Sequence, residues 1–121
     1  MRLEQDQLHI ARQWLSAFNE HNLVKLLALY AEDATHYSPK LKARHPETNG
    51  LISGKENLRA WWKESFDRLP SLHYKATTLT ANGHRVFMEY TRQVDGEADL
   101  AIAEVLEIEN GLIIASRVYH G

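Results

Sequence analysis

The stretch from Leu100 to His120 most constrains the fold, because it reads as two strands joined by a tight turn. Asn110 and Gly111 suit a two-residue type I′ turn, since both tolerate positive φ. In a strand every second side chain faces the same way. The shared face of the first strand carries Leu100, Ile102, Glu104, Leu106 and Ile108. The sequence therefore predicts a β-hairpin with one acid in an otherwise aliphatic row.

The residue opposite Glu104 depends on the register of this hairpin. A two-residue turn places Glu104 opposite Arg117, and this is the register that we expect. A three-residue loop closed by a glycine bulge would place Ser116 there instead. The sequence leaves both registers open.

A carboxylate in an apolar row needs a physical explanation, because burial without a partner is costly. An ion pair with Arg117 would satisfy Glu104 and simply close the core. Alternatively, Glu104 lines a largely apolar pocket, where a raised pKa makes it an acid, a base or a hydrogen-bond donor. The second interpretation points to a function and the first does not.

Length and charge limit the possible partners. The 121 residues predict a single domain over 1–121. A net charge of −2 with no basic cluster predicts no nucleic-acid partner. The chain has neither an apolar run long enough to cross a membrane nor a signal-peptide pattern, so we expect a cytoplasmic protein without a membrane partner.

No cofactor and no metal are predicted. Cysteine is absent, which excludes disulfides, thiolate catalysis and Cys-ligated metal. The chain has seven histidines, but none form an HxH or HExxH pair. A metal site would therefore need ligands from distant segments.

Hydrophobic periodicity and turn residues predict an α+β order of elements. We expect helices at about 6–20, 23–30 and 55–69, a short strand at 34–38, and strands at 72–81, 85–95, 100–109 and beyond Gly111. A capping box at 53–56 would open the third helix. The segment 40–52 has no periodicity, and its basic residues suit either a lid over an anionic substrate or a solvated loop.

Two strands carry further information about faces. Alternation in the strand at 34–38 places His36 and Ser38 on one side. Around 86–91 both faces carry apolar groups, which predicts a sheet covered on two sides. Helices would cover one side, and a second copy of the chain would cover the other. We therefore expect a homodimer that forms through the outer face of the sheet.

The order of elements and several local motifs resemble the nuclear transport factor 2-like superfamily, and within it the SnoaL-like polyketide cyclases. The motifs that carry the resemblance are Phe18–Leu23, Leu27–Ala34, Ser53–Glu56, Leu58–Trp61, Ile108–Gly111 and Arg117–Tyr119. The resemblance covers nearly the whole chain. It implies a cone-shaped, curved antiparallel sheet with three N-terminal helices packed on its concave face, which is also called a cystatin-like fold.

Ketosteroid isomerases of this superfamily imply roles for three positions. Their general-base aspartate corresponds to Ser38, and their oxyanion-hole tyrosine corresponds to Trp14. Their protonated carboxylic acid in the meander corresponds to Glu104. Only the last role is retained, so the resemblance argues against steroid isomerisation in that form.

Other members of the superfamily imply different chemistry. SnoaL-like cyclases often end their last strand with an acid, which this chain lacks, although His120 or His36 would supply a base near neutral pH. Epoxide hydrolases use two carboxylates and an arginine, and Glu89, Arg117 and Glu104 would form such a set if Glu89 points inward.

We expect a cone whose mouth admits a small, mostly apolar molecule, with cofactor-independent isomerase, cyclase or hydrolase chemistry. The predicted catalytic residues are Glu104 as acid or hydrogen-bond donor, His36 as base, and Arg117 and Tyr119 as anion stabilisers. The predicted ligand-binding residues are Trp14, Ser38, Trp62, Glu89 and His120. The alternatives are a ligand-binding or dimeric assembly domain without catalysis, and a core ion pair with no cavity.

Overall fold

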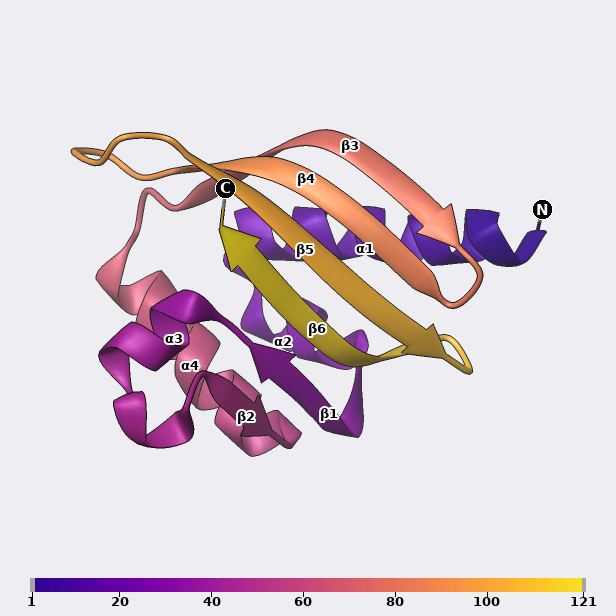
Figure 1. The fold of residues 1–121 in the computed structure, drawn as a ribbon, viewed down its shortest axis with the longest axis horizontal. Helices are drawn as coiled ribbons and strands as arrows, with labels where there is room; N and C mark the ends of the chain where they lie inside the picture. Colours follow the sequence, from indigo (N-terminus) through magenta and orange to yellow (C-terminus); the bar gives the residue numbers. More distant parts are fainter. Residues whose placement is uncertain (1, 121) are drawn as a thin grey trace.

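The computed structural model describes residues 2–120, in which a six-stranded sheet carries helices on one face (Figure 1). In chain order the elements are α1 (Arg2–Asn19), α2 (Leu23–Ala28), β1 (Tyr30–Tyr37), α3 (Pro39–Arg44), the 3₁₀ helix η1 (Pro46–Thr48), β2 (Leu51–Ser53), α4 (Lys55–Arg68), β3 (His73–Asn82), β4 (Arg85–Gln93), β5 (Leu100–Glu109) and β6 (Leu112–His120). The predicted α+β fold, with a curved sheet and helices, is confirmed.

The strands lie side by side in the order β2-β1-β6-β5-β4-β3. β3 to β6 form the expected antiparallel meander, whereas β1 pairs with β6 in parallel. This parallel pairing places His36 of β1 beside Ser116 of β6. Helix α1 packs against β3 and β4, and α4 packs against β1 and β2 (Figure 1). The inner face of the sheet and the helices therefore enclose the core.

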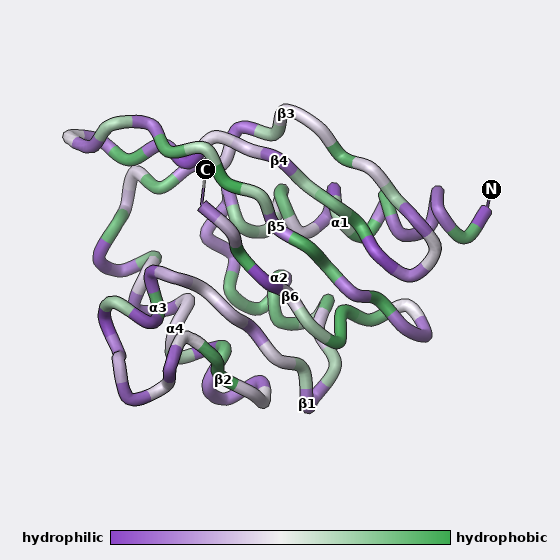
Figure 2. The backbone as a smooth tube through the Cα atoms, in the orientation of Figure 1, coloured by the Kyte–Doolittle hydropathy of each residue, from purple (hydrophilic) through white to green (hydrophobic). Residues whose placement is uncertain are grey.

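Aromatic side chains form much of this core. Trp14 and Phe18, one helical turn apart on α1, stack on Tyr74 of β3. Tyr74 in turn stacks on Tyr90 of β4, with ring centroids 4.1 Å apart. Figure 2 shows that hydrophobic colour along β5 is broken by hydrophilic stretches, as expected for a strand that carries acids among aliphatic residues.

The hairpin turn forms as expected, but the register beyond it differs from both predictions. Asn110 and Gly111 adopt positive φ, and Glu109 lies opposite Leu112. A β-bulge then shifts the pairing by one residue, so that Val118 lies opposite Glu104. A shift of one residue moves each side chain to the other face of a sheet. Arg117 therefore lies on the outer face, and the predicted ion pair with Glu104 is wrong.

The segment 40–52 is largely regular rather than a loop without structure. Pro39 occupies the first turn of α3, and the side chain of Ser38 caps that helix by accepting a hydrogen bond from the backbone N–H of Lys40 at 3.2 Å. Strand β2 then pairs with β1. Periodicity did not reveal α3, because a helix of six residues buries only Leu41.

The predicted capping box at the start of α4 is also wrong. Gly54 occupies the N-cap position at φ +86° and makes no side-chain cap. Ser53 belongs to β2, where its carbonyl oxygen accepts a hydrogen bond from the amide of Asn57 at 2.9 Å. The helix therefore begins one residue later than a Ser53 cap requires.

Candidate functional site

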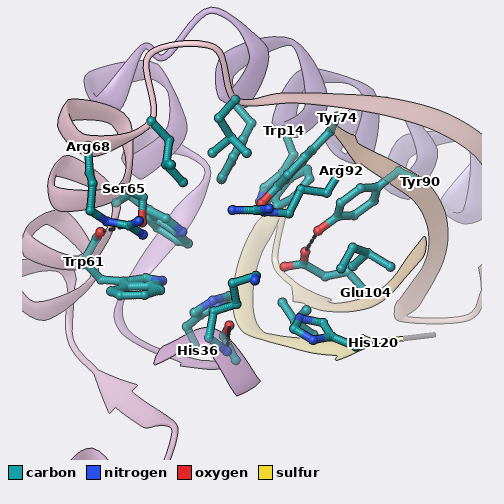
Figure 3. Close-up of a pocket in the computed structure, with 18 residues that line it drawn as sticks. Trp14, His36, Trp61, Ser65, Arg68, Tyr74, Tyr90, Arg92, Glu104 and His120 are labelled. Atoms are coloured by element: carbon teal, nitrogen blue, oxygen red, sulfur yellow. Dashed lines mark hydrogen bonds between the residues drawn. The ribbon is translucent and has the colours of Figure 1, made fainter. Parts of the chain in front are cut away.

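A cleft opens between the inner face of the sheet and helices α1 and α4. Its walls are aromatic, its floor holds an acid and a histidine, and its rim is basic (Figure 3). The lining residues are Trp14, Phe18, His36, Ser38, Lys40, Trp61, Trp62, Ser65, Arg68, Leu69, Leu72, Tyr74, Tyr90, Arg92, Ile102, Glu104, Val118 and His120. Apolar walls with a few convergent polar groups are typical of small-molecule sites.

Glu104 is the acid of this cleft, and it is only 2% exposed. The hydroxyl of Tyr90 donates a hydrogen bond to Oε1 at 2.6 Å. Within residues 2–120, Oε2 has no hydrogen-bond partner. Burial raises the pKa of Glu104 to about 8, because the carboxylate loses its hydration. The side chain is therefore protonated at neutral pH.

The hydrogen bond from Tyr90 indicates which oxygen of Glu104 carries the proton. Burial also raises the pKa of Tyr90, so its hydroxyl stays protonated and acts as the donor. Oε1 accepts that hydrogen bond, which leaves the carboxylic proton on Oε2. Figure 3 shows the Glu104 carboxyl group pointing into the cavity beside Tyr90. The floor of the cleft thus presents a neutral hydrogen-bond donor to a ligand.

His36 is the second buried polar group of the floor. Burial lowers the pKa of His36 to about 4, so the imidazole is neutral at pH 7. Its Nδ1 lies 2.6 Å from Oγ of Ser116. The hydroxyl of Tyr30 donates to the same Oγ at 2.9 Å and accepts from the indole N–H of Trp14 at 3.0 Å. These four side chains form one buried chain of hydrogen bonds.

The donors along this chain favour one tautomer of His36. The indole of Trp14 donates to Tyr30, and Tyr30 donates to Ser116. The proton of Ser116 then has Nδ1 of His36 as its acceptor. Nδ1 is therefore unprotonated, and the proton of the neutral ring lies on Nε2. In this tautomer His36 presents an N–H donor to the cleft, and its predicted role as a base stays a prediction.

His120 lies closer to the mouth, at the end of β6. Burial lowers its pKa, and the nearby Lys40 and Arg92 lower it further. The imidazole is therefore neutral at pH 7 and able to accept a proton. Figure 3 places His120 on the opposite side of the Glu104 carboxyl group from Tyr90.

The structure brings together six of the nine predicted site residues. Those that line the cleft are Trp14, His36, Ser38, Trp62, Glu104 and His120. The remaining three, Glu89, Arg117 and Tyr119, lie on the outer face of the sheet. Glu89 accepts a hydrogen bond from Thr78, Arg117 pairs with Glu107, and Tyr119 is half exposed. The epoxide hydrolase set is therefore not assembled, and Arg117 and Tyr119 cannot act beside Glu104.

Sequence reasoning missed several residues of the cleft. Tyr90 shares the inner face of β4 with Val86 and Met88, so strict alternation would have pointed to it. Ser116 was considered only as a partner of Glu104, whereas it binds His36. Arg68 and Arg92 carry no signal in the sequence, because their positions depend on how α4 and β4 end.

Between Arg2 and His120 no three His, Cys, Asp or Glu side chains lie close enough together to hold a metal ion. In the same range no helix is long and apolar enough to cross a bilayer.

The family model of the SnoaL-like domain matches residues 11–116. The chain belongs to this family. Among solved structures, it is similar to a SnoaL-like protein of unknown function from Burkholderia thailandensis E264, with 25% identity, a TM-score of 0.84, and coverage of 96% of this chain and 93% of that chain. No curated protein matches the sequence.

Two further structures share the fold at lower identity. A candidate ketosteroid isomerase from Kribbella flavida DSM 17836 is 20% identical over 98% of this chain and 79% of that chain, with a TM-score of 0.81. A candidate polyketide cyclase from Sinorhizobium meliloti is 13% identical over 92% and 94%, with a TM-score of 0.78. Other matched structures are described as nuclear transport factor 2-like or cystatin-like. The SnoaL-like chain therefore has a fold related to that of isomerases and polyketide cyclases.

Proposed function

We propose that this SnoaL-like protein binds a small, mostly apolar carbonyl compound and isomerises or cyclises it by acid–base chemistry without a cofactor. The observation that carries the proposal is the buried Oε2 of Glu104, which holds a proton and has no partner within residues 2–120. A buried donor left without a partner is costly, so such a group indicates a site that a ligand completes.

Glu104 and His36 would act together on the carbonyl oxygen. Both groups are neutral at pH 7, and both present a donor to the cleft. Two neutral donors bind an enolate oxygen more strongly than the ground-state carbonyl, because negative charge develops there. The dry, aromatic walls strengthen these hydrogen bonds relative to water. The pair would therefore stabilise the transition state of proton abstraction.

His120 would supply the base. Its neutral imidazole lines the same cleft as Glu104, and a base must reach the carbon next to the bound carbonyl. The relationship of the fold to a candidate ketosteroid isomerase and a candidate polyketide cyclase supports chemistry of this type.

Exchange of α-hydrogens with deuterated water tests the proposal without knowledge of the natural substrate. A panel of cyclic enones and β-keto esters would be incubated with the protein and followed by ¹H NMR. We expect exchange above the uncatalysed rate, and a loss of about 10²- to 10³-fold in the Glu104→Gln variant. The glutamine amide is a far weaker acid than a carboxylic acid, so it stabilises an enolate less.

Glu89→Gln serves as the matched control, because Glu89 lies on the outer face of the same sheet. This variant should exchange at the wild-type rate. Unchanged exchange in Glu104→Gln would reject the role of Glu104. Binding of panel members without any exchange would support the alternative of a ligand-binding protein without catalysis.

A further inference from the structure

Three basic side chains from separate elements lie at the mouth of the cleft. Lys40 lies in the first turn of α3, Arg68 ends α4, and Arg92 lies near the end of β4. Figure 3 shows the guanidinium groups of Arg68 and Arg92 extending into the cavity from opposite sides. We define these three residues as the basic mouth. Its charge is opposite to that of the whole chain, whose net charge is −2.

The basic mouth is only partly neutralised. Arg92 donates to Glu97 at 2.8 Å, and this ion pair uses the only carboxylate that contacts the mouth within residues 2–120. In the same range, neither Lys40 nor Arg68 forms a salt bridge. Three cations therefore face one carboxylate, and the excess positive charge points toward the space that a ligand would enter.

Two titrating groups respond to this excess charge. The pKa of Glu97 is lowered first by Arg92 and then by Lys40 and Arg68. The pKa of His120 is lowered by burial, Lys40 and Arg92. The fields of the three cations therefore overlap at the mouth. Glu97 also shows that a carboxylate pairs with Arg92 at this mouth.

We propose that the basic mouth binds the carboxylate of an aromatic or alicyclic carboxylic acid, whose apolar body lies against Trp61 and Trp62. This inference rests on the proposed function for the orientation of the ligand, which places the reacting carbonyl at Glu104. The substrate class is thus a monoanionic keto acid rather than a neutral ketone. A carboxylate would engage Lys40 and Arg68, while Arg92 shares its charge with Glu97.

The floor of the cleft does not repel an anionic ligand. An ionised Glu104 would repel a second carboxylate, but burial keeps this side chain neutral at pH 7. Both tryptophans line the cleft and form part of its apolar wall. Charge at the rim and apolar walls below it favour a ligand with one charged end. The same charge also attracts anions to the cleft and accelerates their association.

A matched pair of ligands tests the inference by binding alone. The probes are 4-phenylbutyrate and its neutral amide, 4-phenylbutyramide, which differ only in the charged end. All three tryptophans of the chain line the cleft, so their fluorescence reports occupancy. We expect the carboxylate to bind about tenfold more tightly than the amide at low salt. This is the gain expected from two partly exposed charge pairs, with Lys40 and Arg68. This preference should disappear at about 1 M salt, where the Debye length is about 3 Å.

Substitutions then locate the preference. The double variant Lys40→Gln/Arg68→Gln should bind both probes with equal affinity, because the unpaired cations are gone. Glu97→Gln should increase the preference for the carboxylate, since Arg92 loses its internal partner. Arg59→Gln is the control for net charge, because Arg59 is an exposed residue of α4 outside the cleft. This control should keep the wild-type preference.

The inference and the proposed function fail in different ways. Equal affinity of the two probes for the wild-type protein, or no binding of either, would overturn the carboxylate site. Either result would leave the exchange assay with neutral ketones as an independent test of Glu104. If the wild-type protein prefers the carboxylate probe but catalyses no exchange, the proposed chemistry is rejected and the carboxylate site stands.

Discussion

At the scale of single residues, burial raises the pKa of Glu104 and lowers the pKa of His36, the two polar groups on the floor of the cleft. Glu104 is an acid that stays protonated, and His36 is a base that stays unprotonated. Each shift reflects the same cost, which is the loss of hydration by a charged form. Glu104 and His36 therefore place no charge on the floor of the cleft over the neutral range. This arrangement makes stability depend on pH in a specific way.

We predict that the free energy of unfolding is nearly flat from about pH 4.5 to 6.5 and falls above it. Folding raises the pKa of Glu104 from 4.5 to about 8, so the unfolded chain releases this proton first and stability falls as pH rises through that window. Folding lowers the pKa of His36 from 6.5 to about 4, so stability rises with pH between those values. The two slopes offset each other where the windows overlap.

The decline from pH 6.5 to 8 should be about 2 kcal/mol, because one pKa unit corresponds to about 1.4 kcal/mol. Urea unfolding at a series of pH values measures it. The Glu104→Gln variant should lose the decline above pH 6.5 and show the rising slope of His36 below it. The same decline in both proteins would show that Glu104 does not hold its proton in the folded state.

At the scale of secondary structure, the hairpin shows what a sequence pattern can and cannot define. Alternation correctly placed Glu104 on the buried face of β5, and Asn110-Gly111 correctly placed the turn. The bulge in β6 has no comparable signal. It allows Ile113 and Ser116, three residues apart, to be buried on the same side, which strict alternation forbids. Every prediction beyond the bulge that assumed strict pairing was therefore wrong.

The order and type of the long elements were predictable for a physical reason. Helices α1 and α4 and strands β4 to β6 bury enough side chains to show a period. Short elements depend on local contacts instead. The helix α3 is fixed by a proline, a serine cap and one buried leucine, so its composition resembles that of a loop. The walls of the cleft were thus predictable. Of its basic mouth, only Lys40 gave a signal, as part of the basic segment 40–52.

A substitution at Gly50 tests whether the segment between β1 and α4 is held in one conformation. This glycine has φ +85°, and an added Cβ would lie 2.8 Å from Cε1 of Tyr37. We predict that Gly50→Ala destabilises the protein by about 1 to 3 kcal/mol, through backbone strain and this clash. Thermal or urea unfolding provides the measurement.

The control for this prediction is Gly54→Ala. Gly54 has almost the same φ, +86°, but an added Cβ there would meet nothing within 4 Å. Backbone strain alone should destabilise this variant, because no clash adds to it. Equal losses in the two variants would mean that Tyr37 does not pack against Gly50, and that the segment is free to move away from β1.

At the scale of the whole molecule, the two faces of the sheet differ in how they are covered. Helices and the cleft occupy the inner face, whereas the outer face shows apolar groups. Phe87 of β4 is 43% exposed, Leu112 is 39% exposed and Tyr119 of β6 is 50% exposed. A groove beside Tyr119 is lined by small side chains, including Ala101 and Ala103. We propose that this outer face pairs with that of a second copy of the chain.

A dimer of this kind predicts that charge on the outer face separates the two copies. In analytical ultracentrifugation the wild-type protein should sediment as twice its chain mass of 13.9 kDa. The double variant Phe87→Lys/Tyr119→Lys should sediment as a monomer, because an ammonium group buried in the interface loses its hydration. Val24→Lys is the matched control, since Val24 is 75% exposed on α2, away from the outer face.

Substitutions that separate the two copies should not change the activity or the ligand preference of the cleft. Phe87 and Tyr119 point away from Glu104, so the monomeric variant should keep both the exchange activity and the preference for a carboxylate. A wild-type protein that sediments as a monomer, or a double variant that stays dimeric, would contradict the proposed interface. Loss of the carboxylate preference on separation would show that the partner copy contributes to the mouth, because Lys40, Arg68 and Arg92 all belong to one chain.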